Sequence, residues 1–156
     1  RDWNDHMTTA FPEVRLKKYL EMRGADSGDV PRLRALPAFW VGLLYDAQAL
    51  DEAAALVADF SRAERHALRD GVPRHGLALP FRDGDVAALA RRVLASPRGG
   101  LQRRARIDVD GNDESAYLDV LDYIAASGQS AAAQKLARFH GEWNGSVKPL
   151  FNEYAF

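Results

Sequence analysis

This sequence of 156 residues contains no cysteine. The absence excludes disulfide bonds, thiolate metal sites and a cysteine nucleophile, and it fits a reducing, cytoplasmic location. An excess of charge of one sign is also lacking, because 21 basic residues stand against 22 acidic ones. No overall field therefore attracts nucleic acid or an anionic membrane, and we expect neither as a partner.

Long hydrophobic runs and the common catalytic motifs are missing as well. The longest strongly apolar stretch, Ala35–Tyr45, is too short to cross a bilayer, and no signal peptide is visible. The four histidines are scattered without the spacing of a zinc site, and no glycine-rich phosphate loop or nucleophile elbow occurs. With these motifs absent, the remaining candidate is a charged strand near the N-terminus.

Hydrophobic residues make up 47% of the chain, enough for one domain with a hydrophobic core. Their spacing predicts a mostly helical protein, with a kink at Pro37 and a helix break at the SPRGG segment Ser96–Gly100. Ser61 and Glu64 form a capping-box pattern, and Ser130 is expected to cap a later helix. The helices are expected over Asp2–Phe11, Pro31–Tyr45, Leu50–Phe60, Ser61–Gly71, Asp85–Ala95, Leu101–Arg106, Glu114–Ala126, Ser130–His140 and Val147–Tyr154.

The segment Val14–Arg23 stands apart because its polar side chains fall on every second position, with Lys18 as the exception. Side chains alternate between the two faces of a strand, so we predict one strand with an apolar face and a charged face. The charged face carries Arg15, Lys17, Tyr19, Glu21 and Arg23. Such a row suits an anionic, metal-bearing ligand such as a nucleotide phosphate chain; the alternative is a merely solvated strand face.

Glu21 and Arg23 lie two positions apart, about 7 Å along an extended strand. A carboxylate at one position can hold Mg²⁺, and an arginine at the next can reach phosphoryl oxygens that the metal leaves free. The strand has no obvious partner in the chain, and an unpaired strand invites pairing. Since the sequence also begins with Arg, we expect it to be a piece of a longer protein whose other segments complete the sheet.

Three other patterns have simpler interpretations. The DVDGND turn, Asp108–Asp113, lacks the glycine and the glutamate that a calcium loop needs at fixed positions. The arginines within Arg91–Arg106 could contact phosphates of nucleic acid, but without interleaved aromatic residues a solvated helix face is favoured. The aromatic C-terminus is expected to dock on the core; its members are Trp143, Phe151, Tyr154 and Phe156.

Four blocks resemble one known family, the glutamate–cysteine ligases of the plant and alphaproteobacterial type. They are HMTTAFPEVRLKKYLEMRGAD (His6–Asp26), ALPAFWVGLLYD (Ala35–Asp46), PFRDG (Pro80–Gly84) and GEWNGSVKPLFNE (Gly141–Glu153). The resemblance implies an α+β fold: a mostly helical C-terminal portion of a glutamine-synthetase-like catalytic domain, with one or two strands near the N-terminus. Residues 1–156 then form the C-terminal part of a single domain whose N-terminal segments are absent.

The resemblance also implies an activity, in which ATP and Mg²⁺ drive ligation of the γ-carboxylate of glutamate to the amine of cysteine through an acyl phosphate. By its motifs, Glu21 is assigned to the metal, Arg23 to the phosphoryl group and the nucleotide, and Arg15 to catalysis. Lys17 is assigned to the nucleotide from its place in the charged row alone. Partners are the small-molecule substrates and the N-terminal remainder of the ligase, without which the chain should be inactive. The alternative is a non-catalytic helical module whose exposed strand pairs with a partner sheet.

Overall fold

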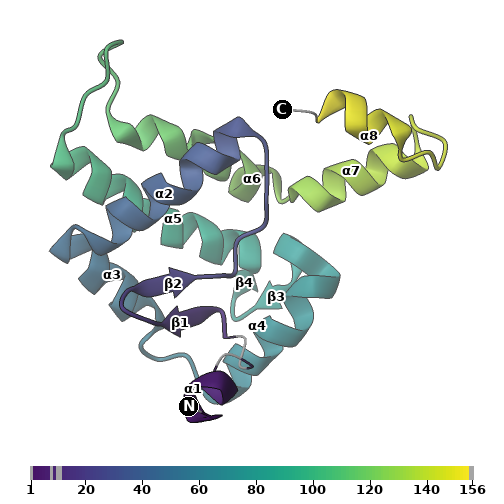
Figure 1. Ribbon diagram of the computed structural model, residues 1–156. Coiled ribbons are helices and arrows are strands. Elements are labelled where there is room, and N and C mark those ends of the chain that lie inside the picture. Colours follow the sequence, from purple (N-terminus) through teal and green to yellow (C-terminus); the bar gives the residue numbers. More distant parts are fainter. Residues whose placement is uncertain (1, 8, 10–11, 155–156) are drawn as a thin grey trace.

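The computed structural model describes residues 2–7, 9 and 12–154 (Figure 1). Most of these residues are helical, and the strands form two small antiparallel pairs, so the α+β prediction is confirmed. The helices are α1 (Asp2–Met7), α2 (Val30–Leu44), α3 (Ala47–Val57), α4 (Arg62–His75), α5 (Val86–Arg104), α6 (Asp119–Ser127), α7 (Ala131–His140) and α8 (Lys148–Glu153). The remaining elements are β1 (Val14–Leu16), β2 (Leu20–Met22), η1 (Gly76–Ala78), β3 (Pro80–Phe81), β4 (Gly84–Asp85) and η2 (Glu114–Leu118).

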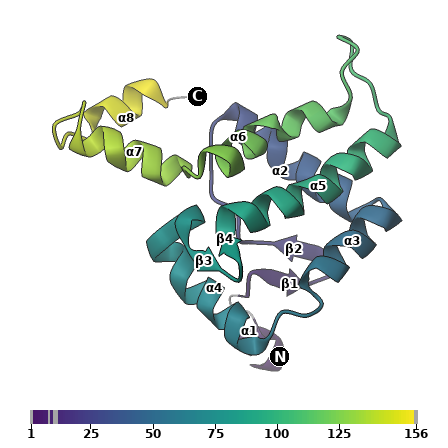
Figure 2. The same ribbon diagram turned by 180° about the vertical axis from the view of Figure 1, so that it is seen from behind.

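The centre of the fold is the crossing of α2 and α5, around which α3, α6 and η2 pack (Figure 2). Leu101 of α5 and Leu118 of η2 are fully buried there beside Ala38 of α2. Two glycines allow the close approach: a Cβ on Gly42 would lie 2.8 Å from Leu101 Cγ, and one on Gly100 would lie 3.0 Å from the carbonyl carbon of Gly42. Small residues at the crossing therefore set the distance between the two central helices.

Two predicted helix ends are wrong. The SPRGG segment does not break the helix, since α5 continues through it to Arg104 and includes most of the segment predicted as a separate helix, Leu101–Arg106. Ser96, Pro97 and Gly100 are buried against the neighbouring helices, and this packing outweighs the local cost of proline and glycine. Likewise α4 continues past Gly71 to His75.

The predicted helix starts at serine are confirmed. Ser61 and Glu64 form the full capping box, in which each side chain accepts a hydrogen bond from the other residue's backbone N–H. Ser130 accepts from the backbone N–H of Ala133 and caps α7. Both caps satisfy backbone donors that the first turn of a helix leaves without partners.

The segment Val14–Arg23 is not one strand, as predicted, but an antiparallel hairpin with its turn at Lys17–Tyr19. The Lys17 backbone N–H donates to the Tyr19 carbonyl at 2.9 Å and closes the turn. The hairpin gives backbone groups on each half a hydrogen-bond partner, which a lone strand would lack. The expectation that this strand has no partner within the chain is therefore wrong.

Helices α7 and α8 form an arm that extends to one side of the helical body (Figures 1 and 2). The prediction that the aromatic C-terminus closes the core is not met, because Phe151 is 72% exposed and Trp143 is buried within the arm itself. The guanidinium of Arg138 lies 4.8 Å from the centre of the Trp143 ring, and Glu153 accepts from Trp143 Nε1 at 3.3 Å. Phe156 lies outside the described residues.

At the N-terminus, α1 covers the first part of the helix predicted over Asp2–Phe11 and ends at Met7. Residues 8, 10 and 11 lie outside the described part of the chain. Among the described helices, none combines the length and apolar character needed to cross a bilayer.

Candidate functional site: a cationic cluster on the β1–β2 hairpin

The hairpin keeps the predicted charged row on one face, although the row now spans two strands. Arg15 in β1 is the direct partner of Glu21 in β2, and directly opposed residues of an antiparallel pair project from the same face. Arg23 lies two positions beyond Glu21 and shares that face. Leu16 and Leu20 oppose each other on the other face, which is apolar. The structure thus brings the predicted site residues together.

Three cations converge on a single carboxylate oxygen. Glu21 Oε2 lies 2.8 Å from Arg15 Nε, 3.9 Å from Lys17 Nζ and 3.9 Å from Arg23 Nε. Tyr19, the remaining member of the row, places its ring 6.0 Å from Lys17 Nζ and is largely exposed. We call Arg15, Lys17, Glu21 and Arg23 the cationic cluster.

The cluster holds Glu21 ionised and carries an excess of positive charge. The hydrogen bond from Arg15 is the largest influence on the pKa of Glu21 and lowers it, and the charges of Arg15, Lys17 and Arg23 lower it further against the opposing effect of desolvation. One negative charge faces three positive ones, and all four side chains keep partial contact with solvent. Such a site favours an anion, above all one that accepts several charge-assisted hydrogen bonds.

Glu21 fits a magnesium ligand only in part. Its carboxylate offers the oxygen donors that Mg²⁺ prefers, but it is the cluster's single carboxylate. In the described part of the chain, no group of three or more His, Cys, Asp or Glu side chains could hold a metal ion. Mg²⁺ commonly takes one or two protein carboxylates and completes its shell with water and substrate phosphates, so Glu21 could supply one ligand of a shared site.

A feature that the sequence did not reveal is a groove of about 530 Å³ between the hairpin and α2. Its walls are mostly apolar, and Arg23 reaches its edge from the charged face. The main lining residues are Val14 and Met22 of the hairpin and Leu36, Phe39 and Trp40 of α2. The apolar residues around Pro37 fit a buried helix as well as a groove wall, so the sequence pattern gave no signal for an open groove.

Four of the arginines within Arg91–Arg106 act as internal cross-links. Arg98 pairs with Asp119 and Asp122, and Arg103 pairs with Asp46. Further along the run, Arg104 pairs with Glu114 at 2.9 Å, and Arg91 donates to the carbonyl of Ala125 at 2.8 Å. These pairings, rather than the predicted solvated helix face, occupy the four arginines, and they argue against phosphate binding by them.

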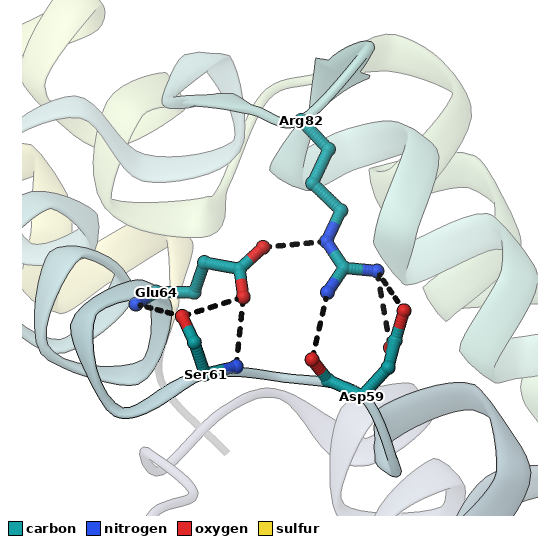
Figure 3. A network of polar contacts seen from close by, with 4 residues as sticks. All are labelled: Asp59, Ser61, Glu64 and Arg82. Atoms are coloured by element: carbon teal, nitrogen blue, oxygen red, sulfur yellow. Dashed lines mark hydrogen bonds and ion pairs between the residues drawn. The ribbon is translucent and has the colours of Figure 1, made fainter.

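Arg82 forms a second polar network that the sequence did not predict (Figure 3). It lies at the tip of the β3–β4 turn, and its Nε donates to Glu64 Oε1 at 2.6 Å while Nη1 donates to both carboxylate oxygens of Asp59. Its guanidinium also lies 4.7 Å from the centre of the Phe60 ring. This network ties the junction of α3 and α4 to the turn before α5.

Comparison with known proteins identifies the family. Residues 1–153 match the model of glutamate-cysteine ligase family 2, so the chain belongs to that family. It is 48% identical over 155 residues to the chloroplastic glutamate–cysteine ligase of Arabidopsis thaliana, covering 99% of this chain and 28% of that protein. The corresponding protein of Brassica juncea is 47% identical, with 99% and 29% covered, and ligase A of Oryza sativa subsp. indica is 46% identical, with 99% and 30% covered. The chain thus spans less than a third of the length of these relatives.

Proposed function

We propose that this chain is the C-terminal part of an ATP-dependent ligase that joins the γ-carboxylate of glutamate to the amine of cysteine. The relatives that match nearly all of the chain carry the name glutamate–cysteine ligase. The observation that carries the proposal is the convergence of Arg15, Lys17 and Arg23 on one oxygen of Glu21, because this arrangement suits a metal-bearing polyphosphate. The substrates are ATP, glutamate and cysteine, and the rest of the ligase is the protein partner.

The reaction has two steps whose charge changes suit the cationic cluster. The γ-carboxylate of glutamate first attacks the γ-phosphorus of ATP, the bond to ADP breaks, and an acyl phosphate forms. The amine of cysteine then attacks the acyl carbon, phosphate leaves with its electron pair, and the amine loses a proton. Negative charge on the phosphoryl oxygens is present in both steps, and fixed cations lower the energy of such transition states.

Each residue of the cluster has a proposed role. Glu21 supplies one carboxylate ligand to Mg²⁺, which when bound helps to neutralise the phosphate chain. Arg23 and Lys17 bind phosphoryl oxygens, Arg23 with its planar donors and Lys17 as a compact charge. Arg15, hydrogen-bonded to Glu21 at 2.8 Å, orients that carboxylate and stabilises the transferred group. A cytoplasmic location stays a prediction, while the names of the relatives place those proteins in the chloroplast.

The test is ATP turnover that depends on both glutamate and cysteine, measured on this chain and on the intact ligase. We expect turnover by the intact ligase and none by the chain alone. Glu21→Gln should abolish turnover while circular dichroism stays unchanged, whereas the control Glu52→Gln, at an exposed position of α3, should retain it. Near-normal turnover of the Glu21→Gln ligase would refute the metal assignment.

A further inference from the structure

Of the three cations around Glu21, Lys17 is the one held least firmly. Arg15 Nε donates a hydrogen bond to Glu21 Oε2 at 2.8 Å from the directly paired position on β1. Lys17 Nζ lies 3.9 Å from the same oxygen, which is beyond hydrogen-bond distance. Its side chain is 42% exposed, against 21% for Arg15 and 27% for Arg23. Lys17 therefore has the least to lose by leaving the carboxylate.

The place of Lys17 in the hairpin also allows its side chain to move. Lys17 lies in the turn, where its backbone N–H is fixed by the Tyr19 carbonyl while its ammonium lies 6.0 Å from the centre of the Tyr19 ring. An exposed ion pair and a distant contact with an aromatic ring are both weak. Because the ammonium is carried on a flexible four-carbon stem, it can change partners without a change in the backbone.

The charge of the cationic cluster opposes a metal ion that arrives alone. Three positive side chains around one carboxylate leave an excess of two positive charges. A divalent cation bound to Glu21 would add to this excess, and like charges at such distances repel. A polyphosphate reverses the balance, because its negative charges offset both the metal and the side chains. Glu21 is therefore suited to accept a metal together with a nucleotide and not before it.

We propose that Lys17 is an exchangeable counter-ion, which neutralises Glu21 before nucleotide binds and transfers to the phosphate chain when nucleotide and metal arrive together. Lys17 is then a positioning residue that sets the order of binding, because it leaves Glu21 to the metal only when phosphate is present to take the ammonium. The proposal rests on the proposed function, since it takes ATP and Mg²⁺ as the ligands of the cluster. It gives Lys17 a role that precedes both chemical steps.

The experiment measures metal and nucleotide binding to the intact ligase without glutamate or cysteine. Mn²⁺, followed by electron paramagnetic resonance, takes the place of Mg²⁺, and the non-hydrolysable ATP analogue AMP-PNP with Mg²⁺ is followed by calorimetry. Without nucleotide, Lys17→Met should bind Mn²⁺ about two- to fivefold more tightly than the wild type, because a competing charge is gone. The same variant should bind AMP-PNP at least about fivefold more weakly, because it lacks the contact between ammonium and phosphate.

Two further variants locate the effect. Lys18→Met removes the same charge from the same turn, but Lys18 takes no part in the ion pairs found around Glu21 among the described residues. Its affinities for Mn²⁺ and for AMP-PNP should match those of the wild type. Adding Glu21→Gln to Lys17→Met should abolish the gain in Mn²⁺ affinity, since that gain depends on the carboxylate. Circular dichroism verifies that each variant is folded.

The opposite signs of the two effects of Lys17→Met decide the question. A loss of affinity for both ligands would show that Lys17 only supports the site, and an unchanged affinity for either one would show that no exchange takes place. A similar gain in Mn²⁺ affinity in Lys18→Met would reveal a general effect of charge, and it too would overturn the proposal. Turnover of the wild-type ligase with glutamate and cysteine tests the proposed function separately, so the two failures are distinguishable.

Discussion

Gly42 of α2 and Gly100 of α5 face each other at the crossing of the two central helices. A Cβ on Gly100 would lie 3.0 Å from the carbonyl carbon of Gly42, and on the other side it would lie 3.1 Å from the Cβ of Asp46. Backbone carbonyl groups cannot move aside as a flexible side chain can. The separation of the helices therefore depends on a bare hydrogen atom at each position.

Gly100→Ala should destabilise the protein by about 1–3 kcal/mol, the usual cost of overfilling a packed interior. The matched control is Gly99→Ala in the same helix, where the added Cβ would meet only Arg103 Nη1, at the far end of a flexible side chain, at 3.1 Å. Because alanine favours the helix over glycine, the control should cost nothing or stabilise slightly. Urea unfolding of both variants measures the difference, and equal midpoints would contradict the close approach.

Acid should weaken the ion pair between Asp46 and Arg103. Hydrogen bonds from Arg103 and from the Ala49 backbone lower the pKa of Asp46 from 3.8 to about 2. A lowered folded-state pKa means that the stabilisation is complete above pH 3.8 and is lost as the pH falls towards 2. Asp46→Asn keeps the helix cap but not the charge. Its stability deficit against the wild type in urea should therefore shrink as the pH is lowered from neutrality to 2.

The exposed Asp51→Asn variant in the same helix is the control for this titration, and its difference from the wild type should stay small throughout. If the stability difference between wild type and Asp46→Asn grew as the pH was lowered, the change would be opposite to the one expected and would refute the ion pair of Asp46 with Arg103.

Two substitutions of Arg82 distinguish the energetic cost of backbone strain in the β3–β4 turn from the contribution of the Arg82 ion pairs. Its φ of 52° lies in the left-handed region that disfavours residues with a Cβ. Arg82→Ala and Arg82→Gly both remove the contacts to Asp59 and Glu64, but only glycine removes the strain. In thermal unfolding both variants should melt below the wild type, with the glycine variant above the alanine variant. The reverse order would contradict the strained turn.

Arg15→Met should raise the pKa of Glu21 towards its ordinary value of 4.5, because the Arg15 hydrogen bond is the largest cause of the lowering. The carboxylate would then begin to take up a proton at a higher pH than in the wild type. Carbon-13 NMR titration of labelled glutamate follows this directly. Lys18→Met removes a charge from the same turn but leaves Arg15, Lys17 and Arg23 around Glu21, so the pKa of Glu21 should stay lowered in this control.

The charged face was predictable from sequence, but the turn within it was not. In this hairpin register, paired residues share parity: Arg15 faces Glu21 and Leu16 faces Leu20. The alternating pattern therefore passes through the turn unchanged and fits one long strand or two short ones equally well. The turn residues Lys17–Tyr19 include no glycine, proline or asparagine, the residues that usually mark a reversal.

Tertiary packing explains the other differences. SPRGG breaks helices by local preference, yet within α5 its small residues are what permit the contact with α2. The partners of Arg82 lie 18 and 23 positions away, a spacing without any local periodicity. Capping, in contrast, is decided within one turn of chain, and the Ser61–Glu64 prediction was confirmed in full.

The arm formed by α7 and α8 is a part of the chain that evolution can change independently of the helical body. Its buried tryptophan, Trp143, is packed by Arg138 and Glu153 of the same arm. The chain enters the arm through Gly128, whose φ of 68° ends α6 with a left-handed turn. The arm buries its tryptophan with its own residues and follows the body after one glycine turn. It can therefore be lengthened, exchanged or lost without repacking the crossing of α2 and α5.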